Sequence, residues 1–290
     1  MAECGGGLLN TRRRKPRNLL RCSPVQTTMP RPLPPEMLDL IVDHLRDEQS
    51  TLRTCCVVSK SWIPRTRTHL FHHVELLSSK CHIKMWKKTF PEPSTSPAHH
   101  ARSLTICGLP VIPAADPGAG DWIRAFCNVV HLHLEHAPRV DHQVSLTPFH
   151  GLSPTVRSLR LTATSSEVFD LVCSFPHLED LALDSLRPTD GAVGRSVPSA
   201  SPKLTGSLEL TTTSETQSIT RQLLDLPDGL HFAMMKVLSL DKDLESMNDL
   251  VSRCSGALES LAIFYSFMGV LLSASLIDRF LTAVRGCRGT

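Results

Sequence analysis

Aromatic residues are scarce in this 290-residue chain: they make up 5% of it, and there is a single tyrosine. Hydrophobic residues together reach 41%, so the chain can fill a core, and with so few aromatic residues that core has to be aliphatic. The ten cysteines include no Cys-x-x-Cys pair, and no apolar stretch near the N-terminus has the form of a secretion signal. These absences favour reduced, mostly buried thiols in the cytoplasm or the nucleus.

Motifs for catalysis and cofactor binding are missing as well. The chain has no Gly-x-Ser-x-Gly, no phosphate loop ending in Gly-Lys-Ser/Thr, no His-Glu-x-x-His and no dinucleotide fingerprint. Cysteine and histidine pairs with zinc-ligand spacing are also missing. We therefore expect a non-enzymatic protein without a metal or cofactor.

One uncharged run, residues 260–277, approaches the length that spans a bilayer. It contains several serines and also fits a strand followed by a helix, so we expect no membrane association, with a membrane helix as the alternative.

Charge is distributed unevenly. Residues 1–32 carry seven Lys or Arg against one acid, a net charge of +6, which leaves −3 for the remaining 258 residues. This Gly-, Arg- and Pro-rich tail is expected to be disordered, and the rest of the chain is not basic enough for a nucleic-acid-binding domain. The run TRRRKPR at residues 11–17 is typical of a nuclear-import or nucleic-acid patch; a solvated charged tail is the alternative.

The most ordered pattern runs from Leu33 to Leu76. Pro34 and Pro35 suit a first helical turn, and Glu36 adds a negative charge near the positive end of the helix dipole. An apolar helix face then follows at Leu38, Ile41, Val42 and Leu45. A second helix is expected with Ser50 as its N-cap and Pro64 at its end. Its predicted buried side consists of Leu52, Cys55, Cys56, Val58, Ser59 and Trp62, and residues 68–71 form a short third segment.

These residues resemble the F-box family, whose pattern is Leu-Pro, a Glu two positions on, an apolar stripe, and a second helix ending in Val-Ser-x-x-Trp. The matching residues here are Leu33, Pro34, Glu36, Leu38, Ile41, Leu45, Leu52, Val58, Ser59 and Trp62, followed by His69-Leu70-Phe71. The resemblance covers about 40 residues; an unrelated small helical bundle is the alternative. It implies that a Skp-type adaptor binds a surface formed and supported by Leu33, Pro34, Leu38, Ile41, Leu45, Leu52, Val58 and Trp62, with Leu33 and Pro34 touching it most directly.

Beyond this stretch a short strand pattern of the Leu-x-Leu type recurs. It is found at residues 74–76, 104–106, 132–134, 159–161, 181–183, 208–210, 238–240 and 261–263, with spacings of 30, 28, 27, 22, 27, 30 and 23. The mean, about 27, lies in the range of leucine-rich repeats. Helix-compatible segments lie between the strands, around Trp86, Trp122, Val168, Leu223 and Leu250, and a last helix is expected over residues 272–284.

The strand pattern resembles the irregular leucine-rich repeats that follow many F-boxes, although the usual repeat asparagine is mostly missing. We therefore predict an α/β chain: a tail at 1–32, an all-α F-box of about three helices at 33–73, and a leucine-rich-repeat-like solenoid with a parallel strand ladder at 74–285. Loops are expected at 91–100, 109–120 and 187–203, and the first strand should follow the F-box without a flexible linker. An ordinary α/β domain is the alternative to the solenoid.

In such a solenoid the exposed strand residues line the concave face, which commonly binds partners. The candidates for target contact are Thr105, His133, Arg160, Glu209 and Ser239. His131 and His133 share that face, and with His136 they form a histidine cluster; surface residues are the favoured interpretation and metal binding the alternative.

The resemblance implies a substrate-recognition subunit of a Skp-cullin-F-box ubiquitin ligase, located in the cytoplasm or the nucleus, which contacts cullin through the adaptor. A scaffold acting outside ubiquitin ligation and a nuclear protein that binds nucleic acid through its tail are the alternatives. The target, the state of the C-terminal end of the repeat and the role of the tail are left open by the residues.

Overall fold

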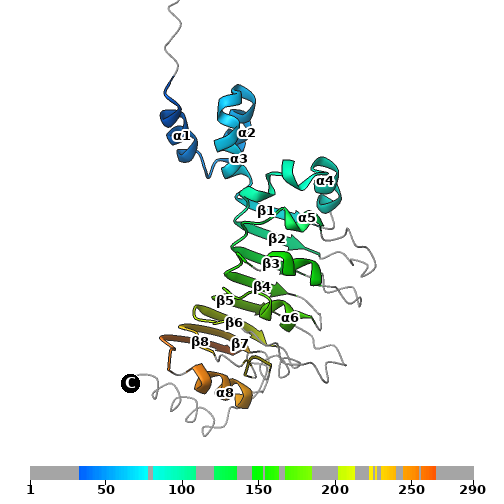
Figure 1. Ribbon diagram of the computed structural model, residues 1–290. Helices are drawn as coiled ribbons and strands as arrows, with labels where there is room; N and C mark the ends of the chain where they lie inside the picture. The colour runs from blue at the N-terminus through cyan, green and yellow to red at the C-terminus, as the bar shows by residue number, and fades with distance from the viewer. Residues whose placement is uncertain are drawn as a thin grey trace, which may run out of the picture.

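The computed structural model describes residues 33–77, 81–108, 121–135, 146–152, 154–162, 167–184, 202–212, 222–224, 226, 230–239, 244–254 and 256–265. The tail at 1–32, the predicted loop at 109–120, most of that at 187–203, His136 and the predicted last helix lie outside these residues. Figure 1 shows a small helical part above a stack of parallel strands. The helical part comprises α1 (Pro35–His44), α2 (Gln49–Val58), the 3-10 turn η1 (Lys60–Trp62) and α3 (Ile63–Leu70).

The strands form one eight-stranded parallel sheet in which each strand pairs with the next one in the chain, from β1 to β8. The bounds are β1 His73–Leu77, β2 Ser103–Cys107, β3 His131–Glu135, β4 Ser158–Thr162, β5 Asp180–Asp184, β6 Ser207–Thr212, β7 Met234–Ser239 and β8 Ser260–Tyr265. This sequential order is compatible with a solenoid, in which each repeat contacts its neighbours in the chain.

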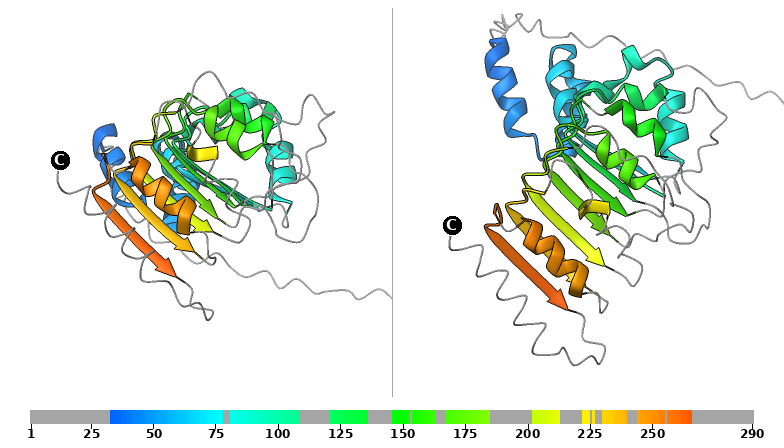
Figure 2. Two further views of the ribbon diagram at one scale, coloured as in Figure 1. Left: turned by 90° about the horizontal axis from the view of Figure 1, so that it is seen from below. Right: turned by 60° about the horizontal axis from the view of Figure 1, so that its bottom comes forward.

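Helical segments follow most strands and lie on one side of the stack (Figure 2). They are α4 His82–Thr89, η3 Pro93–Thr95, η4 Pro97–His100, α5 Asp121–Arg124, η5 Thr147–Leu152, α6 Val168–Cys173 and α8 Leu244–Cys254. The opposite side of the sheet is called the open face below.

Two continuous ladders of aliphatic side chains fill the space between the sheet and these helices. The first is Val74, Leu104, Leu132, Leu159, Leu181, Leu208, Met235 and Leu261; the second is Leu76, Ile106, Leu134, Leu161, Leu183, Leu210, Val237 and Ile263. All are buried except the two on β8, which are half-buried. Because side chains alternate along a strand, one residue between the two ladders always points to the open face.

Strands β2–β5, β7 and β8 begin at the same kind of corner, whereas at the start of β6 the Glu179 carbonyl accepts from the Gly206 N–H and Asp180 Oδ1 accepts from the Ser207 N–H. The carbonyl of His72 accepts hydrogen bonds from the N–H groups of both Arg102 and Ser103, and the carbonyl of Arg102 does the same for Val130 and His131. Similar paired bonds recur down to Ala233, which accepts from Glu259 and Ser260. These corners set the register of every strand relative to the previous one.

Seven of the eight predicted strands are confirmed, and the one at 238–240 is wrong by three residues. In β7 it is Met235 and Val237 that pair with Leu208 and Leu210. The run Met234–Leu240 is apolar at five of seven positions, so two registers fit its alternation. The corner bonds from Ala233 and Met234 to Gly206 decide between them. The last two spacings become 27 and 26 in place of 30 and 23.

Two further expectations are corrected. The segment 91–100 is not a loose loop: Ser96, Pro97 and Ala98 are buried, and Ser96 Oγ accepts a hydrogen bond from the Ala98 N–H that starts η4. The core is not purely aliphatic, because Phe126, Phe149, Phe175 and Phe232 are fully buried. Composition reports how many aromatic residues there are and leaves open where they lie.

The boundaries of the second helix also differ from expectation. It starts two residues early, at Gln49, with Glu48 rather than Ser50 at the N-cap, and it ends at Val58. Pro64 lies in the first turn of α3, where a proline costs no hydrogen bond. Between the two helices, Ser59 is the N-cap of η1, and its hydroxyl accepts a hydrogen bond from the Ser61 N–H at 3.4 Å.

Candidate protein-binding surfaces

The helical module, residues 33–70, is held together by α3. The Asp43 carboxylate on α1 accepts two hydrogen bonds of 2.6 Å from the Arg65 guanidinium on α3, and His69 Nε2 lies 2.8 Å from the same carboxylate. The hydrogen bonds from Arg65, and then from His69, hold the pKa of Asp43 far below its ordinary value of 3.8. These contacts of Asp43 with Arg65 and His69, called the clamp below, orient α1 on α3, although about a third of the Asp43 side chain is exposed.

The small core of this module lies beneath the clamp. Val42 from α1 and Leu52 and Cys55 from α2 are buried. Thr66 on α3 is the buried polar residue here, and its hydroxyl donates to the Trp62 carbonyl at 2.7 Å. The core is therefore made by three helices, none of which is buried on more than one side.

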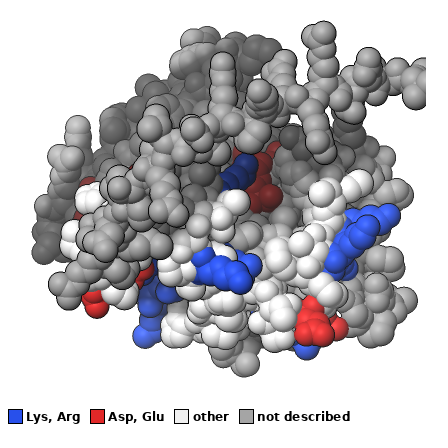
Figure 3. All heavy atoms as spheres, turned by 90° about the horizontal axis from the view of Figure 1, so that it is seen from above, with Lys and Arg blue, Asp and Glu red and all other residues white. Residues whose placement is uncertain are grey.

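Large apolar side chains remain on the outside of the module. They are Leu33 (53% exposed), Met37 (49%), Leu40 (56%), Ile41 (39%), Val57 (87%) and Val58 (66%), and we refer to them as the outer apolar surface. Met37, Leu40 and Ile41 share one side of α1, at i, i+3 and i+4. Figure 3 looks onto this end of the molecule, where scattered charged side chains are separated by uncharged ones.

The residues expected at an adaptor surface separate into two groups. Leu33, Pro34, Ile41 and Val58 are exposed, whereas Leu52 is buried and Leu38, Leu45 and Trp62 are half-buried. The prediction of a buried Val58 is wrong: its side chain lies outside, because α2 packs on α3 by one narrow side. Met37, Leu40 and Val57 join the exposed group, and the only sequence signal for them is an apolar residue next to the expected stripe.

The open face of the sheet carries a central row of side chains that lie side by side. In strand order the row is Glu75, Thr105, His133, Arg160, Ala182, Glu209, Lys236 and Ala262. Four of the five residues expected at a target surface, Thr105, His133, Arg160 and Glu209, belong to it. Ser239 does not belong to it, because the register of β7 differs by three residues from the expected one and Lys236 is the residue that pairs with Glu209 and Ala262. Lys236 takes its place in the row.

Charges in this row neutralise one another. Glu209 lies 2.6 Å from Arg160, which reaches it across Ala182, and 2.7 Å from Lys236. The hydrogen bond from Lys236 lowers the pKa of Glu209. Burial, and then the neighbouring Arg160, lowers the pKa of His133, so its imidazole is neutral at pH 7. The row thus presents a neutral histidine beside a closed ion-pair network.

The apolar end of the open face lies on the last two strands. Met234, Leu238 and Phe264 are 54%, 37% and 51% exposed, and Leu238 pairs with Phe264 across β7 and β8.

The described residues offer neither a metal-binding cluster nor an activated thiol at Cys107 or Cys173. No group of three or more His, Cys, Asp or Glu side chains in the described ranges has metal-binding geometry. The thiols of Cys107 and Cys173 have pKa values raised to about 11, mainly by burial, so both are protonated at pH 7. No helix in the described part of the chain is long and apolar enough to cross a membrane.

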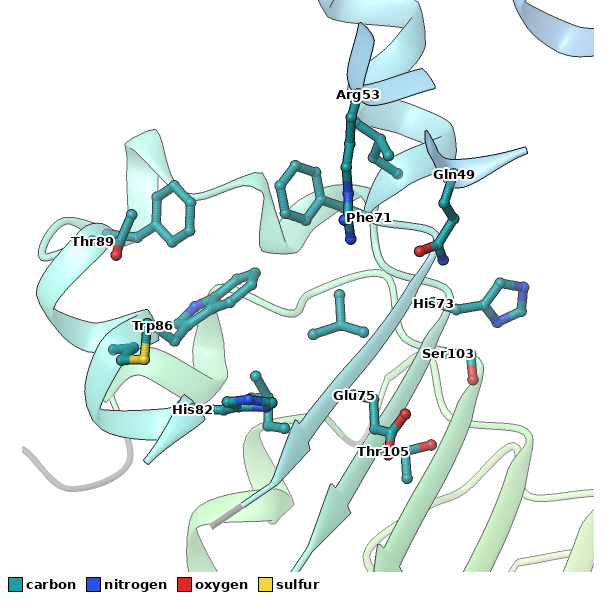
Figure 4. A pocket seen from close by; sticks show the side chains of 15 residues that line it. Gln49, Arg53, Phe71, His73, Glu75, His82, Trp86, Thr89, Ser103 and Thr105 are labelled. Atoms are coloured by element: carbon teal, nitrogen blue, oxygen red, sulfur yellow. The ribbon is translucent and has the colours of Figure 1, made fainter. Parts of the chain in front are cut away.

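A groove lies where the helical module meets the sheet (Figure 4). It has a volume of about 590 Å³ and follows β1, with α2 at one end and α4 along one side. The side chains of Leu70, Phe71, Trp86 and Phe90 form its apolar wall. We call it the edge groove.

Fold and surfaces define an α/β protein with an eight-stranded parallel sheet, a helical module at one end and no metal-binding cluster among the described residues. The sequence matches no known family model and no curated protein.

Proposed function

We propose that this chain is the substrate-recognition subunit of a Skp-cullin-F-box ubiquitin ligase. In this role α1–α3 bind a Skp-type adaptor, the adaptor binds cullin, and the open face of the sheet holds a target protein. The subunit makes and breaks no covalent bond; it raises the concentration of the target near the ubiquitin-charged enzyme.

The outer apolar surface is the observation that carries the proposal. Six large apolar side chains are exposed within residues 33–58, out of ten in the whole described chain. Exposed apolar side chains that gather in one region mark protein interaction sites. They also coincide with the segment whose Leu-Pro start and Val-Ser-x-x-Trp end resemble an F-box.

The connection between the two parts supports the same role. Only two residues separate α3 from β1, and one of them, Phe71, packs edge-on against Trp86 with ring centroids 6.1 Å apart. A target on the sheet is then held at a fixed position relative to the adaptor on the helices.

Capture by a purified Skp-type adaptor tests the proposal. We expect the wild-type chain to bind, and the Leu33→Ala/Pro34→Ala and Met37→Ala/Leu40→Ala variants to lose about 2–4 kcal/mol of binding free energy. Met234→Ala removes an equally exposed methionine from the far end of the sheet and is expected to bind like the wild type. Capture that is equal for all four proteins would overturn the proposal. Cullin in the captured complex separates a ligase subunit from a scaffold that uses the adaptor alone.

A further inference from the structure

The first strand of the sheet has a free edge. β1 stands at the end of the described sheet and pairs there with β2 alone. In a parallel ladder, alternate residues of a strand turn both backbone polar groups to the same side. The His72 carbonyl bonds toward β2, whereas the Leu77 N–H bonds away from it, to His82 Nδ1 at 3.3 Å. His73 and Glu75 share the direction of Leu77, so their N–H and C=O groups face the edge groove.

The edge groove has an apolar wall on the side of the sheet that the helices cover and a polar wall on the side of the open face. On the covered side, Phe71 contacts Trp86 and Phe90 with ring centroids 6.1 and 6.5 Å apart. Met85 lies beside them with 61% of its surface exposed. On the open side the lining residues are polar: His73, Glu75, Ser103 and Thr105. An added strand, whose side chains alternate between these sides, would meet apolar and polar surroundings in turn.

The groove also holds a positive charge that is unpaired among the residues the structure describes. Arg53 extends from α2 toward Phe71 and the groove (Figure 4), and its exposed guanidinium forms no ion pair with any residue that the structure describes. The acid in the lining, Glu75, lies on the far side of β1. A ligand with a carboxylate at the α2 end would complement this guanidinium.

We propose that the edge groove binds an extended segment of a partner protein, which pairs with β1 as an additional strand. Its backbone bonds to the outward N–H and C=O groups of His73 and Glu75. Every second side chain of the bound segment is apolar and packs against Phe71, Trp86 and Met85, and an acidic residue of the segment pairs with Arg53. This is peptide recognition by strand addition, in which the main chain supplies affinity and the pockets supply specificity. It does not depend on adaptor binding by α1–α3.

A displayed library of unconstrained peptides, selected on the full chain, provides the probe. We expect the enriched peptides to share alternate apolar residues and one acidic residue. A synthetic peptide of the enriched sequence should then be measured against four variants. Met85→Asp and Arg53→Glu should each weaken its binding at least about tenfold, because they place an unpaired or repelling charge in the groove. Met234→Asp, an exposed methionine far from the groove, and Arg46→Glu, an exposed arginine on the module, are the matched controls and should bind within about twofold of wild type.

A proline at position 75 isolates the backbone contribution. Glu75→Pro deletes an N–H that faces the groove and none of those that pair with β2, and proline is tolerated on edge strands for this reason. We expect it to weaken the peptide about fivefold relative to Glu75→Ala, the loss of one hydrogen bond. Thermal unfolding and adaptor capture should be the same for both variants, which separates this test from that of the ligase role.

Hydrogen exchange distinguishes the possible occupants. On peptide binding, the amides of His73 and Glu75 should become protected while that of Met234, at the far end of the sheet, does not change. The proposal is overturned if the peptide binds the Met85→Asp and Glu75→Pro variants as tightly as the wild type. It is also overturned if selection on the wild-type chain enriches no peptide relative to a parallel selection on the Met85→Asp variant. It is equally overturned if both amides are protected in the full chain and lose protection on deletion of residues 1–32, because the chain's own tail would then occupy the groove.

Discussion

The helical module and the sheet use apolar residues in opposite ways. In the sheet, the ladder residues of seven strands are buried, because they pack against one another and against the helical segments behind the sheet. In the module, helices α1 and α2 pack on α3 by one side each and leave Met37, Leu40 and Val57 exposed. Similar apolar content therefore stabilises the sheet internally and leaves the module with a surface for a partner.

Paired alanine substitutions give the sharpest test of this difference. Leu161→Ala, at a fully buried ladder position, should lower the free energy of unfolding by about 2–5 kcal/mol, because it removes buried methyl groups and leaves a cavity. Leu40→Ala, at a position that is 56% exposed, should change it by less than about 0.5 kcal/mol. Urea unfolding measures both. Equal losses would mean that the module is covered by something else in this chain.

The corner between β5 and β6 is expected to tolerate no additional side-chain atom at Gly206. A Cβ at Gly206 would lie 2.5 Å from Asp180 Oδ1 and 3.0 Å from the Glu179 carbonyl oxygen. Gly206→Ala should therefore cost about 1–3 kcal/mol, because a backbone atom has to move. Gly256→Ala is the control, since nothing lies within 4 Å of its Cβ. Thermal unfolding of the two variants should differ by several degrees; a stable Gly206→Ala protein would show that the β5–β6 corner yields easily.

The module should be more sensitive to acid than the sheet. The pKa of Asp43 is lowered in the folded state, so its ion pair contributes stability above the unfolded value near 3.8, and this contribution is lost as the pH falls below that value. Asp43→Asn should cost about 1 kcal/mol near pH 6, a modest figure because both partners are partly exposed.

Near pH 3 the difference between the Asp43→Asn variant and the wild type should shrink. Circular dichroism during urea unfolding at the two pH values checks this. A difference that is independent of pH would assign the loss to packing rather than to the carboxylate.

The smallest effect is expected on the open face. Glu209→Gln removes the pairs with Arg160 and Lys236, all of which are at least a third exposed. We expect a loss of no more than about 0.5 kcal/mol at low salt, disappearing near 1 M salt because the charges are screened. Unfolding curves at the two salt concentrations are the measurement, and a loss that persists at high salt would contradict it.

Much of the sheet could be predicted because its signal is local. A strand that buries one side needs apolar residues at every second position, and Leu159-Arg160-Leu161 shows this without any knowledge of its neighbours. The repeated spacing then predicted a parallel ladder, which the structure confirms for seven strands. The exception, β7, has apolar residues in both registers, so its own residues do not determine which side is covered.

The exposed surfaces depended on tertiary packing. Ile41 and Leu45 look alike in an apolar helix stripe, and only the placement of α1 on α3 makes one exposed and the other half-buried. The edge groove has no sequence signature, since it combines Arg53, Glu75 and Trp86 from three separate elements.

By itself, the sequence determined the order of helices and strands and the F-box-like pattern, because periodicity and turn chemistry are properties of short stretches. The tertiary structure alone decided the register of β7, the row that joins Lys236 to Glu209, and the free edge of β1 beside α4. Each of these depends on which distant segments lie next to one another, and that is set by the packing of the whole chain.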